Sequence, residues 1–265
     1  MSALVSRPLF ATPLLSVRDV QCSACRGRHI GAAECDTVSH IVIPYRGNFV
    51  RRVGTRIAHA DVNQALFFNA DEEYRIDHTT DEGDACLSFD VSEPALAELS
   101  GAIRFRRSHR RIEPVLQLQV ARLRHGRCNV LRAEEIALSV ARALLIEDSS
   151  TKPVTPAQRR LVRRAKQTLH ADPHRRWSLS EIAQTIGTSP VHLTQTFSKA
   201  EGMPLYRYQT QLRLAAALHA LPDTDDLTAL ALDLGFSSHS QFTTAFKRMY
   251  GVPPSALKNR KAHAL

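Results

Sequence analysis

The sequence has few of the features that mark secreted, disulfide-stabilised or membrane-spanning proteins. Its five cysteines in 265 residues are an odd number, and we expect reduced thiols rather than a disulfide scaffold. No run approaches the roughly 20 apolar residues that a membrane helix needs, and the start lacks a basic segment followed by an apolar signal core. We therefore expect a cytoplasmic protein with no membrane partner.

Signatures of catalysis are also missing. The histidines are isolated rather than grouped in the His-x-His clusters that β-barrel metalloenzymes use. The sequence has no serine nucleophile elbow, no phosphate-binding loop and no paired catalytic carboxylates. These absences predict a protein that is not an enzyme and needs no cofactor. They leave room for a small-molecule effector, whose identity the sequence does not indicate.

Positive charge is concentrated in the C-terminal part of the chain. The net charge is +9, and residues 152–265 contain 16 Lys or Arg against 7 Asp or Glu, whereas residues 1–151 contain 19 of each. A basic excess confined to one part of a chain predicts a polyanionic partner for that part. A smaller concentration of arginine runs from Arg104 to Arg111.

The first third of the chain has the pattern of a small β-structure. Between residues 39 and 91, short runs of β-forming residues are separated by turn residues such as Arg46-Gly47-Asn48. Evenly spaced short strands favour a sandwich or barrel. We assign residues 1–98 to this domain.

Residues 99–147 have a helical character instead. Two amphipathic helices are predicted, each with one apolar stripe. The stripes are Leu116, Val120 and Leu123 in the first helix, and Ile136, Val140, Ala141 and Leu144 in the second. Such helices can pack on the barrel or against a second subunit, so the segment 114–147 is a candidate homodimer surface.

The most informative feature is a helix-turn-helix pattern that occurs twice. Residues 148–155 are polar, lack periodicity and are predicted to be a linker, with Thr155 capping the helix that follows. Apolar residues then recur at helical spacing and repeat 48 residues later, with Gly187 and Gly235 at the two turns. The first set is Leu179, Ile182, Ala183 and Ile186, and the second is Leu227, Leu230, Ala231 and Leu234. Paired helix-turn-helix motifs present two exposed helices, and the groove that such helices usually fill is that of DNA.

The aromatic residues at helical spacing are expected in the core of this part. They include Phe197, Phe236, Phe242, Phe246 and the single tryptophan, Trp177. Ser189 and Ser238 are placed to cap the second helix of each motif by accepting a backbone N–H.

Several fixed spacings in the second motif carry a family resemblance. The stretch from Ala231 to Phe242 contains Gly-Phe-x-Ser and is followed by Phe246-Lys247 and then by Gly-x-x-Pro at Gly251. With these motifs, residues 156–260 resemble the DNA-binding domain of the AraC/XylS transcription regulators, and residues 1 to about 95 resemble, less specifically, their cupin-like domain.

The resemblance implies an α+β multidomain fold, with a cupin-like β-barrel and flanking helices followed by an all-α domain of two helix-turn-helix motifs joined by a linker helix. It also implies a sequence-specific transcription regulator, with activation as the favoured role, and double-stranded DNA and RNA polymerase as partners.

The resemblance also suggests which side chains meet DNA. The residues implied to contact bases are Val191, Thr194, Gln195, His239, Ser240 and Thr244. Those suited to phosphates are Lys199, Arg207, Ser237, Lys247 and Arg248. Many family members have Arg where this chain has Gln195 and Thr244, so strong guanine recognition is not expected there. Gln195 can instead pair with adenine through two hydrogen bonds.

One alternative remains open, a metal- or redox-sensing regulator. Cys22 and Cys25 have the Cys-x-x-Cys spacing at which two thiolates can share a zinc ion, and Cys35 lies nearby. The adjacent Arg26 and Arg28 could lower the pKa of a thiol. A closed zinc site needs four ligands, and the sequence does not identify the remaining ones.

Overall fold

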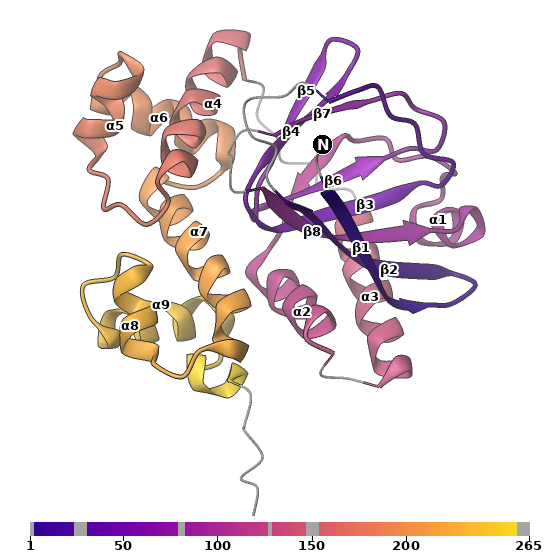
Figure 1. Cartoon of the computed structure of the whole chain (residues 1–265). Helices are drawn as coiled ribbons and strands as arrows, with labels where there is room; N and C mark the ends of the chain where they lie inside the picture. The colour runs from indigo at the N-terminus through magenta and orange to yellow at the C-terminus, as the bar shows by residue number, and fades with distance from the viewer. Residues whose placement is uncertain (1–2, 24–30, 79–82, 127–128, 147–153, 259–265) are drawn as a thin grey trace, which may run out of the picture. The chain divides into compact units, whose positions relative to one another are not determined.

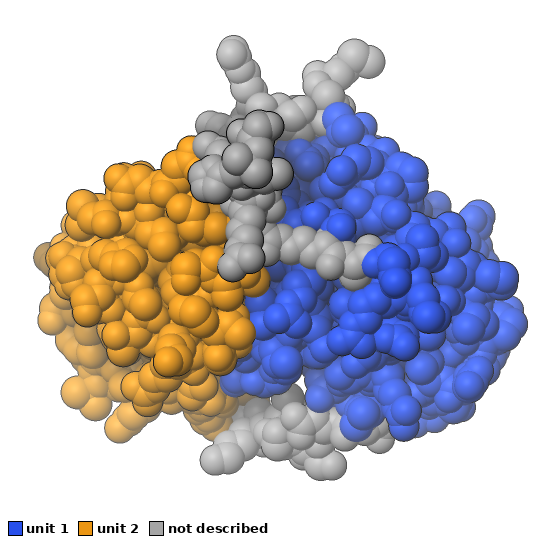
Figure 2. Space-filling view, turned by 90° about the horizontal axis from the view of Figure 1, so that it is seen from below, with its two compact units in different colours: residues 1–147 blue, residues 148–265 orange. Residues whose placement is uncertain are grey.

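The chain divides into two compact units, residues 1–147 and 148–265 (Figures 1 and 2). The structure is a computed structural model, and it describes residues 3–23, 31–78, 83–126, 129–146 and 154–258. The predicted order of a β-rich unit followed by an all-α unit with helix-turn-helix motifs is confirmed. Most of the predicted linker, residues 148–153, lies outside the described residues.

The first unit contains two antiparallel sheets. In the six-stranded sheet the order is β1 (Ala3–Ala11), β2 (Leu15–Ser23), β8 (Asp84–Val91), β3 (His40–Arg46), β6 (Gln64–Phe68) and β9 (His109–Arg111). In the three-stranded sheet the order is β5 (Arg56–Ala60), β4 (Phe49–Val53) and β7 (Arg75–His78). The central strands of the larger sheet are buried on both faces, which explains why β3 and β6 are continuous rather than alternating apolar runs.

Two apolar clusters fill the space around the larger sheet. One face packs against the three-stranded sheet, with Val42, Phe68 and Cys86 meeting Phe49 and Ala58. The opposite face packs against three helices, α1 (Glu93–Ser100), α2 (Pro114–Arg124) and α3 (Val130–Leu145). Figure 1 shows α2 and α3 on one side of this sheet.

The helices of segment 99–147 therefore share the core of the sheets. Both predicted apolar stripes, from Leu116 to Leu123 and from Ile136 to Leu144, are buried in the cluster that covers the large sheet. Of the two roles that the stripes could have, packing within the chain is the one observed. Arg110 links β9 to the end of α3, because its Nη1 donates to the carbonyl oxygens of Ala143 and Leu144.

Between residues 154 and 258, the second unit forms helices and no strands. It consists of α4 (Pro156–Ala171), α5 (Leu179–Ile186), α6 (Pro190–Glu201), α7 (Leu205–Ala220), α8 (Leu227–Asp233) and α9 (His239–Tyr250), with short 3-10 turns at Leu221–Asp223 and Pro254–Leu257. Helices α5 and α6 lie near one end of α7, and α8 and α9 near the other (Figure 1). Among the described helices of either unit, none combines the length and apolarity needed to cross a bilayer.

Candidate nucleic-acid interface

The first helix-turn-helix motif is delimited by local capping. At the start of α5, the Ser178 hydroxyl accepts from the backbone N–H of Glu181, whose carboxylate accepts from the backbone N–H of Ser178. These hydrogen bonds from Ser178, with a further one from Arg175, lower the pKa of Glu181 to about 2. At its other end, α5 stops at Gly187, which adopts a left-handed conformation with φ of 69°.

Helix α6 is the second helix of this motif, and its two faces differ in burial. The Ser189 hydroxyl accepts from the His192 N–H at 3.2 Å, and Pro190 occupies the first helical position. Leu193 and Phe197 are fully buried, whereas Val191 is 67% exposed. The exposed face is therefore available to a partner.

The second motif repeats this construction and has additional hydrogen bonds between Ser237 and Gln241 at the turn. The Asp226 carboxylate caps α8 by accepting from the N–H groups of Thr228 and Ala229. The Ser238 hydroxyl caps α9 by accepting from the Gln241 N–H at 3.2 Å. Ser237 also stabilises the start of α9, since both its N–H and its hydroxyl donate to the Gln241 side-chain oxygen at 2.8 Å.

Every residue assigned to DNA contact lies on the surface. This holds for the base-contact set, Val191, Thr194, Gln195, His239, Ser240 and Thr244, and for the phosphate set, Lys199, Arg207, Ser237, Lys247 and Arg248. Two hydroxyl groups are already engaged within the chain. Thr194 donates to the Pro190 carbonyl at 3.0 Å, and Ser237 is held by Gln241 as described. A contact from Thr194 to a base needs a change of rotamer or acceptance through an oxygen lone pair, and a contact from the Ser237 hydroxyl to a phosphate needs this hydroxyl to leave Gln241.

Four of the apolar residues at helical spacing are only partly covered, namely Trp177, Leu179, Leu227 and Leu230. Leu179 is 38% exposed because it is the first residue of α5, where the helix has no preceding turn to cover it. Trp177 is half-buried, with the Arg175 guanidinium 4.0 Å from its ring centre and its indole N–H donating to the Asp172 carbonyl. The other aromatic residues, Phe197, Phe236, Phe242 and Phe246, are buried.

A junction that the sequence does not reveal connects the two motifs. Arg213, on α7, donates to the carbonyl oxygens of Arg175 at 2.6 Å and of Gly235 at 3.3 Å. Arg176 also donates to the Gly235 carbonyl, at 3.0 Å. A methyl group on Gly235 would overlap the carbonyl oxygen of His174, so the chain passes very close to this turn. We call Arg213, Gly235 and the backbone of residues 173–176 the Gly235 junction.

The cysteines show no metal cluster among the described residues. Cys25 lies outside those residues, Cys35 is exposed, and Cys22 is buried. Within the described part of the chain, no group of three or more His, Cys, Asp or Glu side chains is arranged to hold a metal ion. The Cys22 sulfur instead lies 3.8 Å from Nε2 of His78, whose Nδ1 is hydrogen-bonded to Asp84.

Two capped motifs joined by one helix define the C-terminal unit as a tandem helix-turn-helix domain. Residues 182–260 match a protein-family model described as a helix-turn-helix domain. Over 87 residues the chain is 33% identical to a putative AraC-like transcription regulator of Streptomyces lividans, a match that spans 32% of this chain and 29% of that protein. The tandem unit is therefore similar to the helix-turn-helix domains of AraC-like regulators, as its motifs indicated.

Two other relatives match over stretches of similar length. The uncharacterized HTH-type transcriptional regulator YidL of Escherichia coli K12 is 35% identical over 108 residues, which are 40% of this chain and 36% of YidL. The HTH-type transcriptional activator AarP of Providencia stuartii is 37% identical over 81 residues, which are 30% of this chain and 60% of AarP. The chain therefore aligns with less than two thirds of each of these relatives.

Among solved structures, ToxT from Vibrio cholerae O395 aligns with 92% of this chain and 97% of its own, at 12% identity and a TM-score of 0.39. A score at this level transfers no property of ToxT to this protein.

Proposed function

We propose that the protein is a sequence-specific DNA-binding transcription regulator that inserts α6 and α9 into two successive major grooves. The observation that carries the proposal is the repeated construction of these helices. Each begins at a serine cap, buries an apolar stripe and leaves a polar face exposed. The basic excess of residues 152–265 supports a polyanionic partner for the same unit.

The two recognition helices have different chemistry. On α6, Gln195 can read adenine through two hydrogen bonds and Val191 can touch a thymine methyl group. On α9, the exposed side chains His239, Ser240 and Thr244 are small or singly hydrogen-bonding, so we assign this helix more to positioning than to base discrimination. Lys247 lies in the last turn of α9 and is suited to a phosphate.

Selection of bound sequences from random DNA by the full-length protein tests the proposal. We expect an enriched motif with two parts about one helical turn apart. The Gln195→Ala variant should relax the preference at one position of that motif, whereas Gln184→Ala, an exposed glutamine on α5, should leave the motif unchanged. Enrichment of no motif, with equal retention on every duplex, would contradict the proposal.

Salt dependence separates phosphate contacts from base contacts. Lys247→Ala should weaken binding evenly across sequences and reduce the slope of log affinity against log salt by about 0.9. Removing an exposed arginine of the first unit, as in Arg122→Ala, is the control and should leave the slope unchanged. An unchanged slope for Lys247→Ala would remove this residue from the interface.

Activation, with RNA polymerase as a partner, is the role we propose within this class, since AarP is described as an activator. A homodimer through residues 114–147 would have to use the outward faces of α2 and α3, because the apolar stripes of both helices are buried within the unit. Val115, Val130 and Leu131 are the large apolar side chains exposed there.

A second candidate function, thiol-based sensing, is favoured by the contact between Cys22 and His78. An imidazole held by a carboxylate on its far nitrogen can accept the proton of a neighbouring thiol, which then becomes a nucleophile. In this arrangement Cys22 would react with an oxidant or electrophile, and Cys25 could take part as a second thiol.

Metal analysis and alkylation of the purified protein test this candidate. Bound zinc would favour metal sensing. Loss of DNA affinity on alkylation, absent in Cys22→Ser, would favour a reactive thiol. No metal and no change in DNA affinity would exclude both.

A further inference from the structure

A hollow in the first unit is lined by four arginines, two of them from the basic run between Arg104 and Arg111. It is small, with an enclosed volume of about 30 Å³, and it opens to solvent. Arg51 of β4 and Arg56 of β5 form one side, and Arg106 and Arg107 form the other. Phe67, Phe105, Val53 and Ile57 are among the apolar residues that complete the wall.

The innermost cation is Arg51, which is 3% exposed. It points between the two sheets, and its guanidinium lies over the Phe68 ring at 4.3 Å from the centroid. One nitrogen, Nη2, donates to Glu72 at 2.7 Å, whereas Nε is buried with no hydrogen-bond partner among the described residues. A buried guanidinium N–H without a partner is uncommon, because the group loses its hydrogen bonds to water and gains none in return.

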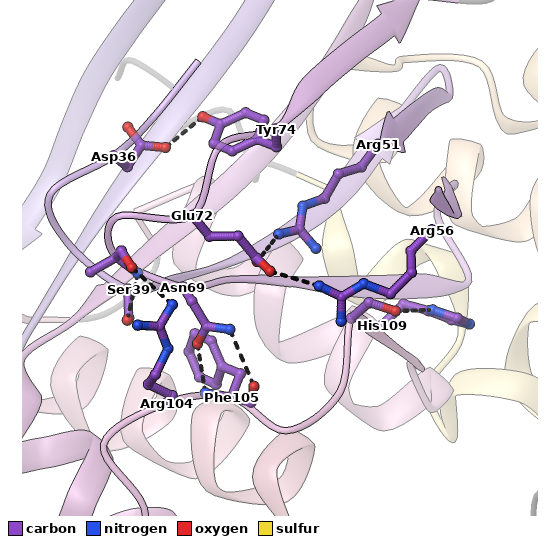
Figure 3. A network of polar contacts seen from close by, with 12 residues as sticks. Asp36, Ser39, Arg51, Arg56, Asn69, Glu72, Tyr74, Arg104, Phe105 and His109 are labelled. Carbon is purple, nitrogen blue, oxygen red and sulfur yellow. Dashed lines mark hydrogen bonds and ion pairs between the residues drawn. The ribbon is translucent and has the colours of Figure 1, made fainter. Parts of the chain in front are cut away.

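The charges around the hollow do not balance. Glu72 is the only carboxylate among the residues that line it, against four guanidinium groups. Figure 3 shows that Arg51 and Arg56 converge on this one carboxylate, with Arg56 donating to its other oxygen at 3.0 Å. Both oxygens of Glu72 are therefore engaged, and Arg51 and Arg56 share a single negative charge.

The loop that carries Arg106 and Arg107 is fixed on both sides. Asn69 accepts from the Phe105 N–H at 2.7 Å and donates to the Phe105 carbonyl at 3.2 Å (Figure 3). Beyond the two arginines, the Ser108 carbonyl accepts from the Phe67 N–H at 3.1 Å. The backbone thus holds these cations at the mouth of the hollow, and a ligand need not order the loop.

Three other arginines of the basic run make contacts outside the hollow. Arg104 donates to the Ala70 carbonyl, Arg110 to the end of α3, and Arg111 to Glu113. Arg106 and Arg107 are the members of the run that line the hollow.

We propose that this hollow binds the oxyanion group, a carboxylate or a phosphate, of a small molecule that also has an apolar part. Guanidinium groups match the planar geometry of carboxylates and the oxygens of phosphates, and the aromatic and aliphatic wall provides contact for an apolar body. The depth of Arg51 favours a small molecule over a nucleic acid backbone, because a duplex cannot enter a concavity of this size. That such a ligand would act as an effector rests on the proposed function in transcription.

Calorimetry with the full-length protein and three probes tests the proposal. Phenylacetate and phenyl phosphate carry the two oxyanions on the same ring, and phenylacetamide is the uncharged control. We expect binding of at least one anion and none of the amide. The anion that binds more tightly shows whether the hollow prefers a carboxylate or a phosphate.

Variants locate the binding site. Arg51→Gln risks misfolding because the side chain is buried, so the main variant is Arg106→Gln/Arg107→Gln, which changes two exposed residues. Loss of even one charged hydrogen bond should raise the Kd at least about tenfold. The double variant Arg122→Gln/Arg142→Gln removes the same charge from exposed positions of α2 and α3 and should bind like the parent.

Two results would overturn the proposal. One is that neither anion binds, and the other is that both double variants bind an anion as the parent does. The measurement contains no DNA, so its failure would leave the proposed DNA binding standing, and absence of DNA binding would not affect its outcome.

Discussion

Substitution of the two turn glycines by alanine should have unequal effects, although the glycines occupy equivalent places in the repeat. Gly187 has φ of 69° and Gly235 has φ of 78°, so alanine at either position adopts a left-handed conformation that costs about 1–2 kcal/mol. At Gly187 the new methyl group would meet nothing within 4 Å. At Gly235 it would overlap the His174 carbonyl oxygen and lie 3.2 Å from the Arg213 guanidinium carbon.

The overlap at Gly235 can be relieved only if the turn moves away from residues 173–176. That movement lengthens the hydrogen bonds that Arg213 and Arg176 donate to the Gly235 carbonyl. A hydrogen bond from a charged donor contributes about 1.5–3 kcal/mol, and these two are partly screened by solvent, so we count the pair as one. Gly235→Ala should therefore lower the free energy of unfolding by about 2.5–5 kcal/mol, against about 1–2 kcal/mol for Gly187→Ala.

Fluorescence of the single tryptophan provides the assay. Trp177 lies beside the Gly235 junction, since Arg175 stacks on its ring and also accepts from Arg213. Urea unfolding followed by Trp177 emission should thus report on this unit. Gly251→Ala is the control, because this glycine has φ of 76° with nothing within 4 Å of the added methyl group, and it should behave like Gly187→Ala. Losses for Gly187→Ala and Gly235→Ala that agree within about 0.5 kcal/mol would refute the reasoning, because that is the scatter expected of unrelated surface substitutions.

Further predictions concern the caps, a carboxylate and the connecting helix. Ser189→Ala and Ser238→Ala should each destabilise the unit by about 1 kcal/mol in the same unfolding assay, and a loss near zero would mean that the cap is redundant. The folded-state pKa of Glu181 is about 2, below the usual 4.5, so its contribution to stability is present above about pH 4.5 and is lost as the pH falls toward 2. A Glu181→Gln variant should lack this pH dependence in urea titrations at pH 3 and pH 6, and parallel curves for the two proteins would contradict the assignment. Ala216→Pro, in the middle of α7, should abolish specific DNA binding in a mobility-shift assay while circular dichroism retains most of the helical signal, and unimpaired binding would show that α7 does not set the spacing of α6 and α9.

The helix-turn-helix repeat was predictable because its signals are local. A serine cap, a left-handed glycine and an apolar stripe each act within one or two turns of helix, and the sequence contains all three in both motifs. The β-rich character of the first unit was predictable for a similar reason, since strand and turn composition is also local.

Contacts between distant segments were not predictable in the same way. Arg213 occurs in an ordinary helical stretch, and only the fold brings it to carbonyl groups at residues 173, 175 and 235. Trp177 was expected in the core because of its size, yet it closes a loop through a cation–π contact and one hydrogen bond. The basic run from Arg104 to Arg111 could be recognised as a run. Which of its arginines bond to backbone carbonyls and which line the hollow depends on the path of the loop between α1 and β9.

The Gly235 junction also bears on how the two proposed DNA contacts are coupled. A helix such as α7 fixes the distance between its ends but leaves the motif at either end free to tilt about its own short connection. Arg213 and Arg176 restrict that freedom, because they join the turn of the second motif to the segment that leads into the first. Substitutions in the junction should therefore weaken both halves of a selected DNA motif together, whereas loss of the Ser189 or Ser238 cap should weaken mainly the half that its own helix contacts.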